Sequence, residues 1–323
     1  MKPIAIAIAD VHVNDWKQHS QYIDRLHMSL LPLILASREA ARYKIPILLP
    51  GDLVHNSARM DNKVLDAITA AWQEHLQYVD VVAISGNHDM VEKNTPNHRS
   101  PSYIESLSRA WPKLHCIDEP GKSWSNERIA VHGIPFLTHN EGFRDLLRKE
   151  EKVIMRGKIN ILLVHRDLPK ALTPSGFSLG ESDDITLSRI SKHFDLVLAG
   201  HVHKPMRLYK KSVYMLGAPG HQDMGDMGTD MGYWWVMEDG SMKFRPGLMP
   251  EFKYLKKGEP IPNHDHYWVY RDDEPEESED DVSMKAFSID SDRGKLARAY
   301  CKAIGEDDKK KIQLLTDLLN EAQ

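Results

Sequence analysis

The sequence predicts an α/β fold, because short apolar runs alternate with helical segments and a polar motif follows each run. Residues 4–9 are uncharged and alternate between large and small side chains, which is typical of a strand buried on both faces. Residues 45–49 and 79–85 are further runs of this kind. In open α/β sheets ligands bind beyond the carboxyl ends of the strands, where these polar motifs lie.

The remaining elements follow from the spacing of apolar residues. Helices are expected where that spacing is three to four, over residues 22–43, 63–78 and a charged segment at about 140–156. Strands continue at residues 129–134, 159–164 and 196–199. From residue 206 to residue 238 the pattern changes to short strands between turns, which predicts a second, more antiparallel sheet.

The C-terminal part reads as separate from the main domain. The Met/Gly-rich stretch 224–232 is expected to be a flexible loop, and the acidic run 272–281 a linker. A strand is expected at residues 284–289 and helices at 295–304 and 308–319. We predict a main domain over residues 1–245, a small capping domain over 246–290 and partner-binding helices over 291–323.

Composition places limits on function. The net charge of -5 argues against a strongly basic protein, although a local basic patch could still bind nucleic acid. Cys116 and Cys301 are too few and too far apart for a disulfide framework or a thiolate metal site. The apolar N-terminal run is too short to span a membrane and lacks the pattern of a secretion signal. We therefore expect a soluble, cytoplasmic chain with no membrane partner.

Five polar motifs carry the chemistry. They are Asp10-Val11-His12, Gly51-Asp52-Leu53-Val54-His55, Gly86-Asn87-His88-Asp89, Val164-His165 and Gly200-His201-Val202-His203. Taken singly each motif is weak, since most Asp-x-His triplets are surface residues, Gly-Asp is often a turn and a lone histidine is usually structural. All five in one order at strand ends are hard to obtain by chance.

Together the motifs offer seven oxygen and nitrogen ligands, enough for two adjacent metal ions: Asp10, His12, Asp52, Asn87, His165, His201 and His203. Residues two apart on a strand point to the same side, so Asp10 and His12 are expected to face one pocket. His201 and His203 follow the same rule, and the Asp52 carboxylate could bridge both ions. The thiolate-free set suits Mn²⁺, Fe²⁺ or Zn²⁺, among which the sequence does not choose, and Mg²⁺ is also compatible.

Two such ions would form a clamp on an in-line displacement at phosphorus, which indicates metal-assisted hydrolysis of a phosphate ester. His88 belongs to no chelating pair and is placed to protonate the leaving alkoxide or to stabilise charge in the transition state. Asp89 is expected to hydrogen-bond His88 and orient it.

With these motifs the chain resembles the calcineurin-like metallophosphoesterase superfamily over about residues 2–236. The resemblance implies a four-layer sandwich of two mixed sheets flanked by helices, with a small C-terminal capping unit. It implies Asp10, His12, Asp52 and His203 on one ion. It implies Asp52, Asn87, His165 and His201 on the other, with His88 as the acid.

Within that superfamily the chain looks most like the SbcD-type DNA repair nucleases. His55 corresponds to a histidine thought to contact the substrate phosphate there, and residues 214–222 and 232–234 resemble the strand–turn–strand that closes the nuclease domain. The tail resembles the capping domain and C-terminal helices. Gly217-Ala218-Pro219 departs from the usual Gly-Ser-Pro.

This resemblance implies DNA as the substrate and a homodimer within a hetero-tetramer with an SbcC-type ABC ATPase. The chain itself has no Walker motif, so ATP dependence would come from the partner. The DNA-contacting candidates follow the last motif: Lys204, Arg207, Lys210 and Lys211. The plain alternative for such lysines and arginines is a solvated surface.

The leading hypothesis is therefore a Mn²⁺-dependent DNA exonuclease/endonuclease subunit. A stand-alone phosphodiesterase or phosphatase acting on nucleotides or other small esters is the alternative. A third hypothesis is a metal-bearing scaffold that acts mainly by binding a partner, against which the complete ligand set argues.

Overall fold

The computed structural model describes residues 1–17, 23–91, 101–176, 178–179, 185–210, 212–247, 249–262 and 266–271. Residues Met1–Glu274 form one compact unit and Pro275–Gln323 another. The strand expected at 284–289 and the helices expected at 295–304 and 308–319 lie outside the described residues. The three domains inferred from the sequence, with their two boundaries, stay predictions.

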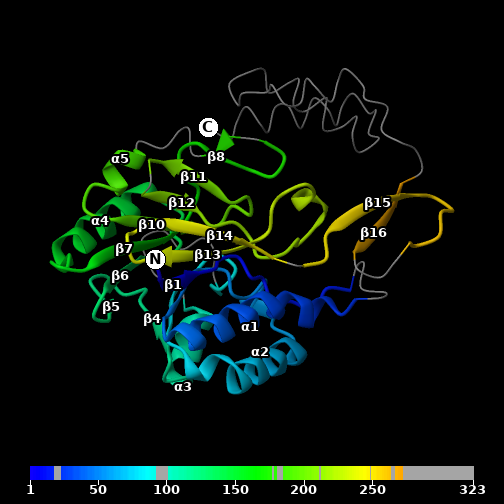
Figure 1. Cartoon of the computed structure of the whole chain (residues 1–323), viewed down its shortest axis with the longest axis horizontal. Coiled ribbons are helices and arrows are strands. Elements are labelled where there is room, and N and C mark those ends of the chain that lie inside the picture. Colours follow the sequence, from blue (N-terminus) through cyan, green and yellow to red (C-terminus); the bar gives the residue numbers. More distant parts are fainter. Residues whose placement is uncertain are drawn as a thin grey trace. The chain divides into compact units, whose positions relative to one another are not determined.

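The first unit is built around two six-stranded sheets (Figure 1). The first sheet has the order β14-β13-β1-β2-β3-β4. Its strands are β1 (Pro3–Ala7), β2 (Ile47–Pro50), β3 (Val81–Ile84), β4 (Leu114–Cys116), β13 (Gly232–Met237) and β14 (Met242–Pro246). The four early strands run parallel, and β13 and β14 add antiparallel at one edge.

The second sheet has the order β11-β12-β10-β7-β6-β5. Its strands are β5 (Ser123–Ser125), β6 (Ile129–Ile134), β7 (Ile159–His165), β10 (Leu196–Gly200), β11 (Met206–Tyr209) and β12 (Val213–Met215). The separate antiparallel sheet expected over residues 206–238 is therefore wrong. β12 pairs parallel with β10, and β13 pairs antiparallel with β1, because each extends an open edge of an existing sheet.

Helices cover the outer face of each sheet (Figure 1). The helices are α1 (Arg25–Tyr43), α2 (Asn62–Glu74), α3 (Tyr103–Ala110), α4 (Asn140–Glu150) and α5 (Leu187–Ile190). α1 begins after Asp24, whose carboxylate accepts hydrogen bonds from the first free backbone amides. α2 and α4 are shorter than the expected 63–78 and 140–156, because short 3-10 turns, η2 (Leu76–Tyr78) and η3 (Glu151–Val153), replace their last turns.

Three apolar cores separate four layers, which confirms the predicted sandwich. One core lies between α1–α3 and the first sheet, one lies between the two sheets, and one lies between the second sheet and α4–α5. β1 shows how the sequence specifies this arrangement. Ile6 and Ile8 pack on the helix side, whereas the small Ala5, Ala7 and Ala9 let the second sheet approach.

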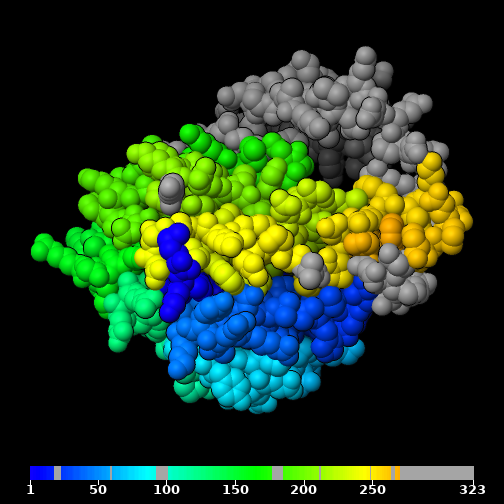
Figure 2. All heavy atoms as spheres, in the orientation of Figure 1, coloured from blue at the N-terminus to red at the C-terminus, as the bar shows by residue number. Residues whose placement is uncertain are grey.

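Smaller elements complete the unit. They are the parallel pair β15 (Phe252–Lys256) and β16 (Tyr267–Arg271), the pair β8 (Ala171–Leu172) and β9 (Ser178–Leu179), and the turns η1 (Ser57–Arg59) and η4 (Met224–Asp226). In the space-filling view of Figure 2, β13 and β14 form a yellow band between the blue α1 and the green second half of the chain. Within the described ranges no helix is long and apolar enough to cross a membrane.

Candidate metal centre

The five motifs meet where the two sheets present the carboxyl ends of their central strands. His165 is the last residue of β7, and the other six expected ligands lie in loops that follow β1, β2, β3 and β10. All seven are buried or half-buried. The structure thus brings the whole expected ligand set to one place.

The backbone brings Asp10 and His12 together in a different way from the one expected. β1 ends at Ala7, so these residues do not share a strand face. Both have left-handed backbone angles, with φ of 53° and 49°, and Asp52 and His201 do so too, with φ of 54° and 97°. Non-glycine residues adopt such angles at a cost of about 1–3 kcal/mol each, and they cluster at functional sites. Tight loops, not strand periodicity, turn these side chains inward.

Asp10, His12 and His203 form one group whose donor atoms are close enough to hold a metal ion. Nε2 of His12 lies 3.3 Å from Nε2 of His203. The same His12 nitrogen lies 3.5 Å from Oδ2 of Asp52. This group therefore borders the Asp52 carboxylate.

Asp52, His165 and His201 form a second such group. Asn87 completes it, since its Oδ1 lies 3.0 Å from Nε2 of His165 and 3.0 Å from Nδ1 of His201. Oδ2 of Asp52 lies 3.3 Å from Nε2 of His165. One oxygen of Asp52 thus faces both groups, which is the placement expected of a bridging carboxylate.

The charges of this cluster are strongly coupled. Burial raises the pKa of Asp10 to about 6. Burial alone would also raise the pKa of Asp52, but His165 and His12 outweigh it and hold that pKa well below its usual range. Burial would lower the pKa of His165, yet Asp52 raises it to about 9. Buried carboxylates are stabilised by paired charges or by a coordinated metal ion.

Two glycines let the loops approach closely. A Cβ on Gly86 would lie 2.2 Å from Oδ1 of Asp52, and one on Gly51 would lie 2.4 Å from Nδ1 of His165. That same His165 nitrogen donates to the carbonyl oxygen of Pro50 at 2.8 Å. The backbone therefore fixes the proton on Nδ1 and presents Nε2 to the ligand group.

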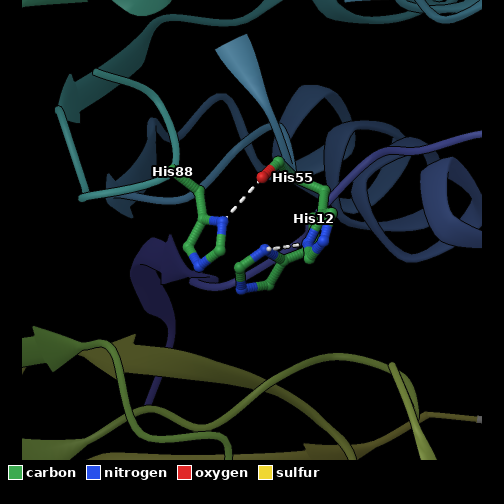
Figure 3. A group of neighbouring side chains, drawn as sticks. All are labelled: His12, His55 and His88. Atoms are coloured by element: carbon green, nitrogen blue, oxygen red, sulfur yellow. Dashed lines mark hydrogen bonds between the residues drawn. The ribbon is translucent and has the colours of Figure 1, made fainter. Parts of the chain in front are cut away.

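His55 and His88 lie beside the first group (Figure 3). Nδ1 of His88 donates to the backbone carbonyl oxygen of His55 at 2.6 Å, and the two rings stack with centroids 4.9 Å apart. Nδ1 of His55 lies 3.4 Å from Nδ1 of His12. His12, His55 and His88 could themselves hold an ion. They contain no carboxylate, however, and His12 already belongs to the first group.

Asp89 does not make the contact expected of it. Its fully buried carboxylate accepts hydrogen bonds from the backbone amides of Asp52, Val54 and Gly86, at 2.6, 3.1 and 2.9 Å. The hydrogen bond that orients His88 comes from His55 instead. Burial raises the pKa of Asp89 to about 8. Asp89 ties the loop that carries Asp52 to the loop that carries Asn87.

Sequence reasoning missed Asp226, which lies in η4 within the Met/Gly-rich stretch. Its Oδ1 and Oδ2 lie 3.1 and 3.2 Å from Nδ1 of His203. No motif spacing predicts the contact between Asp226 and His203. Two aspartates, Asp226 and Asp230, lie in this stretch, and the sequence alone does not distinguish them.

The candidate DNA contacts follow His203 in the sequence. Lys204 follows His203 directly and is half-buried, whereas Arg207 and Lys210 are exposed on and after β11. Nζ of Lys210 lies 5.2 Å from the ring centre of Tyr209. Lys211 lies outside the described residues.

The ligands present fit divalent cations. Carboxylate, amide and imidazole donors without thiolate suit Mn²⁺, Fe²⁺ or Zn²⁺, and the groups are preformed around two points. The identity of the metal does not follow from these atoms.

Comparisons with known proteins agree with this geometry. Residues 5–205 match the model of the calcineurin-like phosphoesterase family, so the chain belongs to that family. It is accordingly a phosphoesterase of the hydrolase class, in a family that typically binds divalent metals. No curated protein matches the chain. Among solved structures, the crystal structure of the Pseudomonas putida nuclease MPE is similar at 17% identity, covering 55% of this chain and 68% of that one. The TM-score of this match is 0.29.

Proposed function

We propose that this chain is a Mn²⁺-dependent DNA nuclease subunit that binds two divalent ions. The observation that carries the proposal is the pair of ligand groups meeting at Asp52 beside the stacked His55 and His88. Such a centre suits cleavage of a phosphodiester, in which one oxygen attacks the phosphorus atom while another oxygen leaves it.

The residues divide into holding and catalytic roles. Asp10, His12 and His203 would hold one ion, and Asn87, His165 and His201 the other, with Asp52 shared. When bound, the ions supply Lewis-acid stabilisation of the phosphate and lower the pKa of water.

His88 is the proposed proton donor. Because its Nδ1 proton is held by the His55 carbonyl oxygen, the His88 ring would act as an imidazolium that passes its Nε2 proton to the leaving oxygen and keeps the one on Nδ1. The ring of His55 packs against His88 on one side and against Trp16, with ring centroids 4.4 Å apart, on another. The backbone carbonyl of His55 therefore holds His88 in place, and in the proposed complex the His55 ring contacts the substrate phosphate.

DNA is the proposed substrate because cationic side chains follow the last ligand. Lys204, Arg207 and Lys210 lie within a few residues of His203 and would contact the phosphate backbone. The resemblance to SbcD-type nucleases extends the proposal to a homodimer that works with an SbcC-type ABC ATPase in DNA repair.

The test compares substrates in one assay. Purified chain with Mn²⁺, alone and with the ABC ATPase encoded by the same genome, is incubated with linear DNA, mononucleotides and bis-p-nitrophenyl phosphate. DNA cleavage that is lost in Asp52→Asn supports the proposal. Cleavage of the small diester without any cleavage of DNA would overturn the nuclease function and favour the stand-alone phosphodiesterase.

A further inference from the structure

The buried carboxylate of Asp226 is the strongest feature that the ligand set leaves unexplained. Asp226 is 3% exposed although it lies in a loop. Its Oδ1 and Oδ2 face Nδ1 of His203 at 3.1 and 3.2 Å, and Oδ2 also accepts the backbone amide of Gln222 at 2.8 Å. Burying a carboxylate is costly unless it is paired, so these contacts are specific.

The contact determines which nitrogen of His203 can bind a metal. A carboxylate that accepts the Nδ1 proton leaves the lone pair on Nε2 and fixes the plane of the ring. That Nε2 lies 3.3 Å from Nε2 of His12, inside the first ligand group. Asp226 thus acts on the ligand atom from the opposite side of the imidazole ring.

The same loop also supports the loop that carries Asp10. The side-chain amide of Gln222 donates to the carbonyl oxygens of Val11 at 3.3 Å and Asp10 at 3.5 Å. The carbonyl oxygen of Gln222 in turn accepts from the buried Arg25 at 2.6 Å. Asp10 and His203, two expected ligands of the first group, are therefore both held by hydrogen bonds from the short segment 222–226.

The second group is built differently. Nδ1 of its His165 donates a hydrogen bond to the backbone carbonyl oxygen of Pro50 at 2.8 Å. That acceptor lies outside the loop that carries Asp226. The hydrogen bonds that orient the histidines therefore differ between the two groups. A substitution of Asp226 removes a hydrogen bond of the first group only.

We propose that Asp226 is a positioning residue that sets the tautomer and orientation of His203, so that this loop controls occupancy of the first metal site. The proposal rests on the proposed function in that it needs two ion sites, but it does not depend on the substrate being DNA.

The experiment measures Mn²⁺ binding to the full chain by isothermal titration and by metal content after dialysis. Asp226→Ala should weaken one of the two sites by 10- to 100-fold and leave the other near its original affinity. Asp226→Asn, which keeps an oxygen acceptor, should have the smaller effect. Asp230→Ala is the matched control, since Asp230 lies in the same stretch but is exposed.

Long-range ¹H–¹⁵N spectra of the metal-free chain supply a readout independent of activity. Burial would lower the pKa of His203, but Asp226 raises it to about 9, so the spectra are recorded above about pH 10, where the ring is neutral. The signal of His203 should then show the Nδ1–H tautomer in the original chain and lose that preference in Asp226→Ala. Two sites of unchanged affinity in a folded Asp226→Ala variant, or an unchanged His203 tautomer, would overturn the proposal. If Asp226→Ala loses one metal site and the original chain does not cleave DNA, the proposal on Asp226 is supported and the proposed nuclease function is overturned.

Discussion

Nδ1 of His88 lies 2.6 Å from the backbone carbonyl oxygen of His55, so one motif positions the proposed acid of the next. Because the acceptor is backbone, the orientation of His88 survives changes in the side chain of His55. The roles of the two histidines can therefore be separated by substitution.

His88→Ala should lower kcat for phosphodiester hydrolysis by about 10²–10⁴-fold, the usual contribution of a positioned acid, without reducing metal content. His55→Ala should act mainly on KM, because it removes a phosphate contact but retains the carbonyl. Steady-state kinetics on bis-p-nitrophenyl phosphate with metal analysis checks both. His139→Ala, an exposed histidine remote from the ligand groups in sequence, is the control. Full kcat in metal-loaded His88→Ala would contradict the assigned role.

Gly86→Ala should disrupt the ligand centre more than its size suggests. The added Cβ would lie 2.2 Å from Oδ1 and 2.6 Å from the backbone nitrogen of Asp52, so the two loops must separate. Overpacking of this kind costs about 1–3 kcal/mol. Urea unfolding should show that loss, and Mn²⁺ binding should fall as well. Gly220→Ala is the comparison, because its Cβ would meet nothing nearer than 3.7 Å. Equal behaviour of the two variants would refute the packing argument.

Local patterns, apolar runs that end in polar motifs, predict the strands and the seven residues that gather at their ends, whereas the four layers are implied by the family resemblance. Local patterns fail where partners are distant. The strand pattern of residues 206–238 is correct, but nothing local says that β13 would pair with β1 at the other end of the domain. The proximity of Asp10 and His12 was expected for a strand-based reason, whereas left-handed loop angles produce it.

Asp89 and Asp226 show the same limit in the site itself. Asp89 is adjacent to His88 in sequence, yet its carboxylate bonds to backbone amides of the preceding motif. Asp226 reaches His203 across 23 residues through an irregular turn. Hydrogen bonds between loops depend on backbone geometry that side-chain periodicity does not encode.

Divalent metal should stabilise the folded chain. Asp10 and Asp52 are buried in the two ligand groups, and an ion that binds the folded state alone adds about 2.7 kcal/mol at a hundredfold excess over Kd. The melting temperature should therefore rise when Mn²⁺ is added and fall back when a chelator removes it. Asp52→Asn should lose most of this shift because it weakens both groups. An equal shift in Asp52→Asn would mean that the stabilising ion binds elsewhere.

Acid stability provides a test away from the metal groups, at the edge of the first sheet. Asp80 precedes β3, and its carboxylate accepts from Nε2 of His115 at 2.8 Å and from Nζ of Lys113 at 3.2 Å. Burial alone would raise the pKa of Asp80, but these hydrogen bonds outweigh it and lower that pKa. The folded-state pKa is thus below the unfolded value of about 3.9. The resulting stability is present above about pH 4 and is lost as the pH falls through the folded-state pKa.

Asp80→Asn should therefore cost up to about 1 kcal/mol at pH 7, a modest value because the pair is partly exposed. The difference from the original chain should shrink as the pH falls below about 4. Urea unfolding of chelator-treated protein between pH 7 and pH 3 measures it. Asp66→Asn on the exposed side of α2 should show no such dependence. If the Asp80→Asn difference stays constant down to pH 3, the carboxylate's ionisation does not contribute to holding β4 against β3.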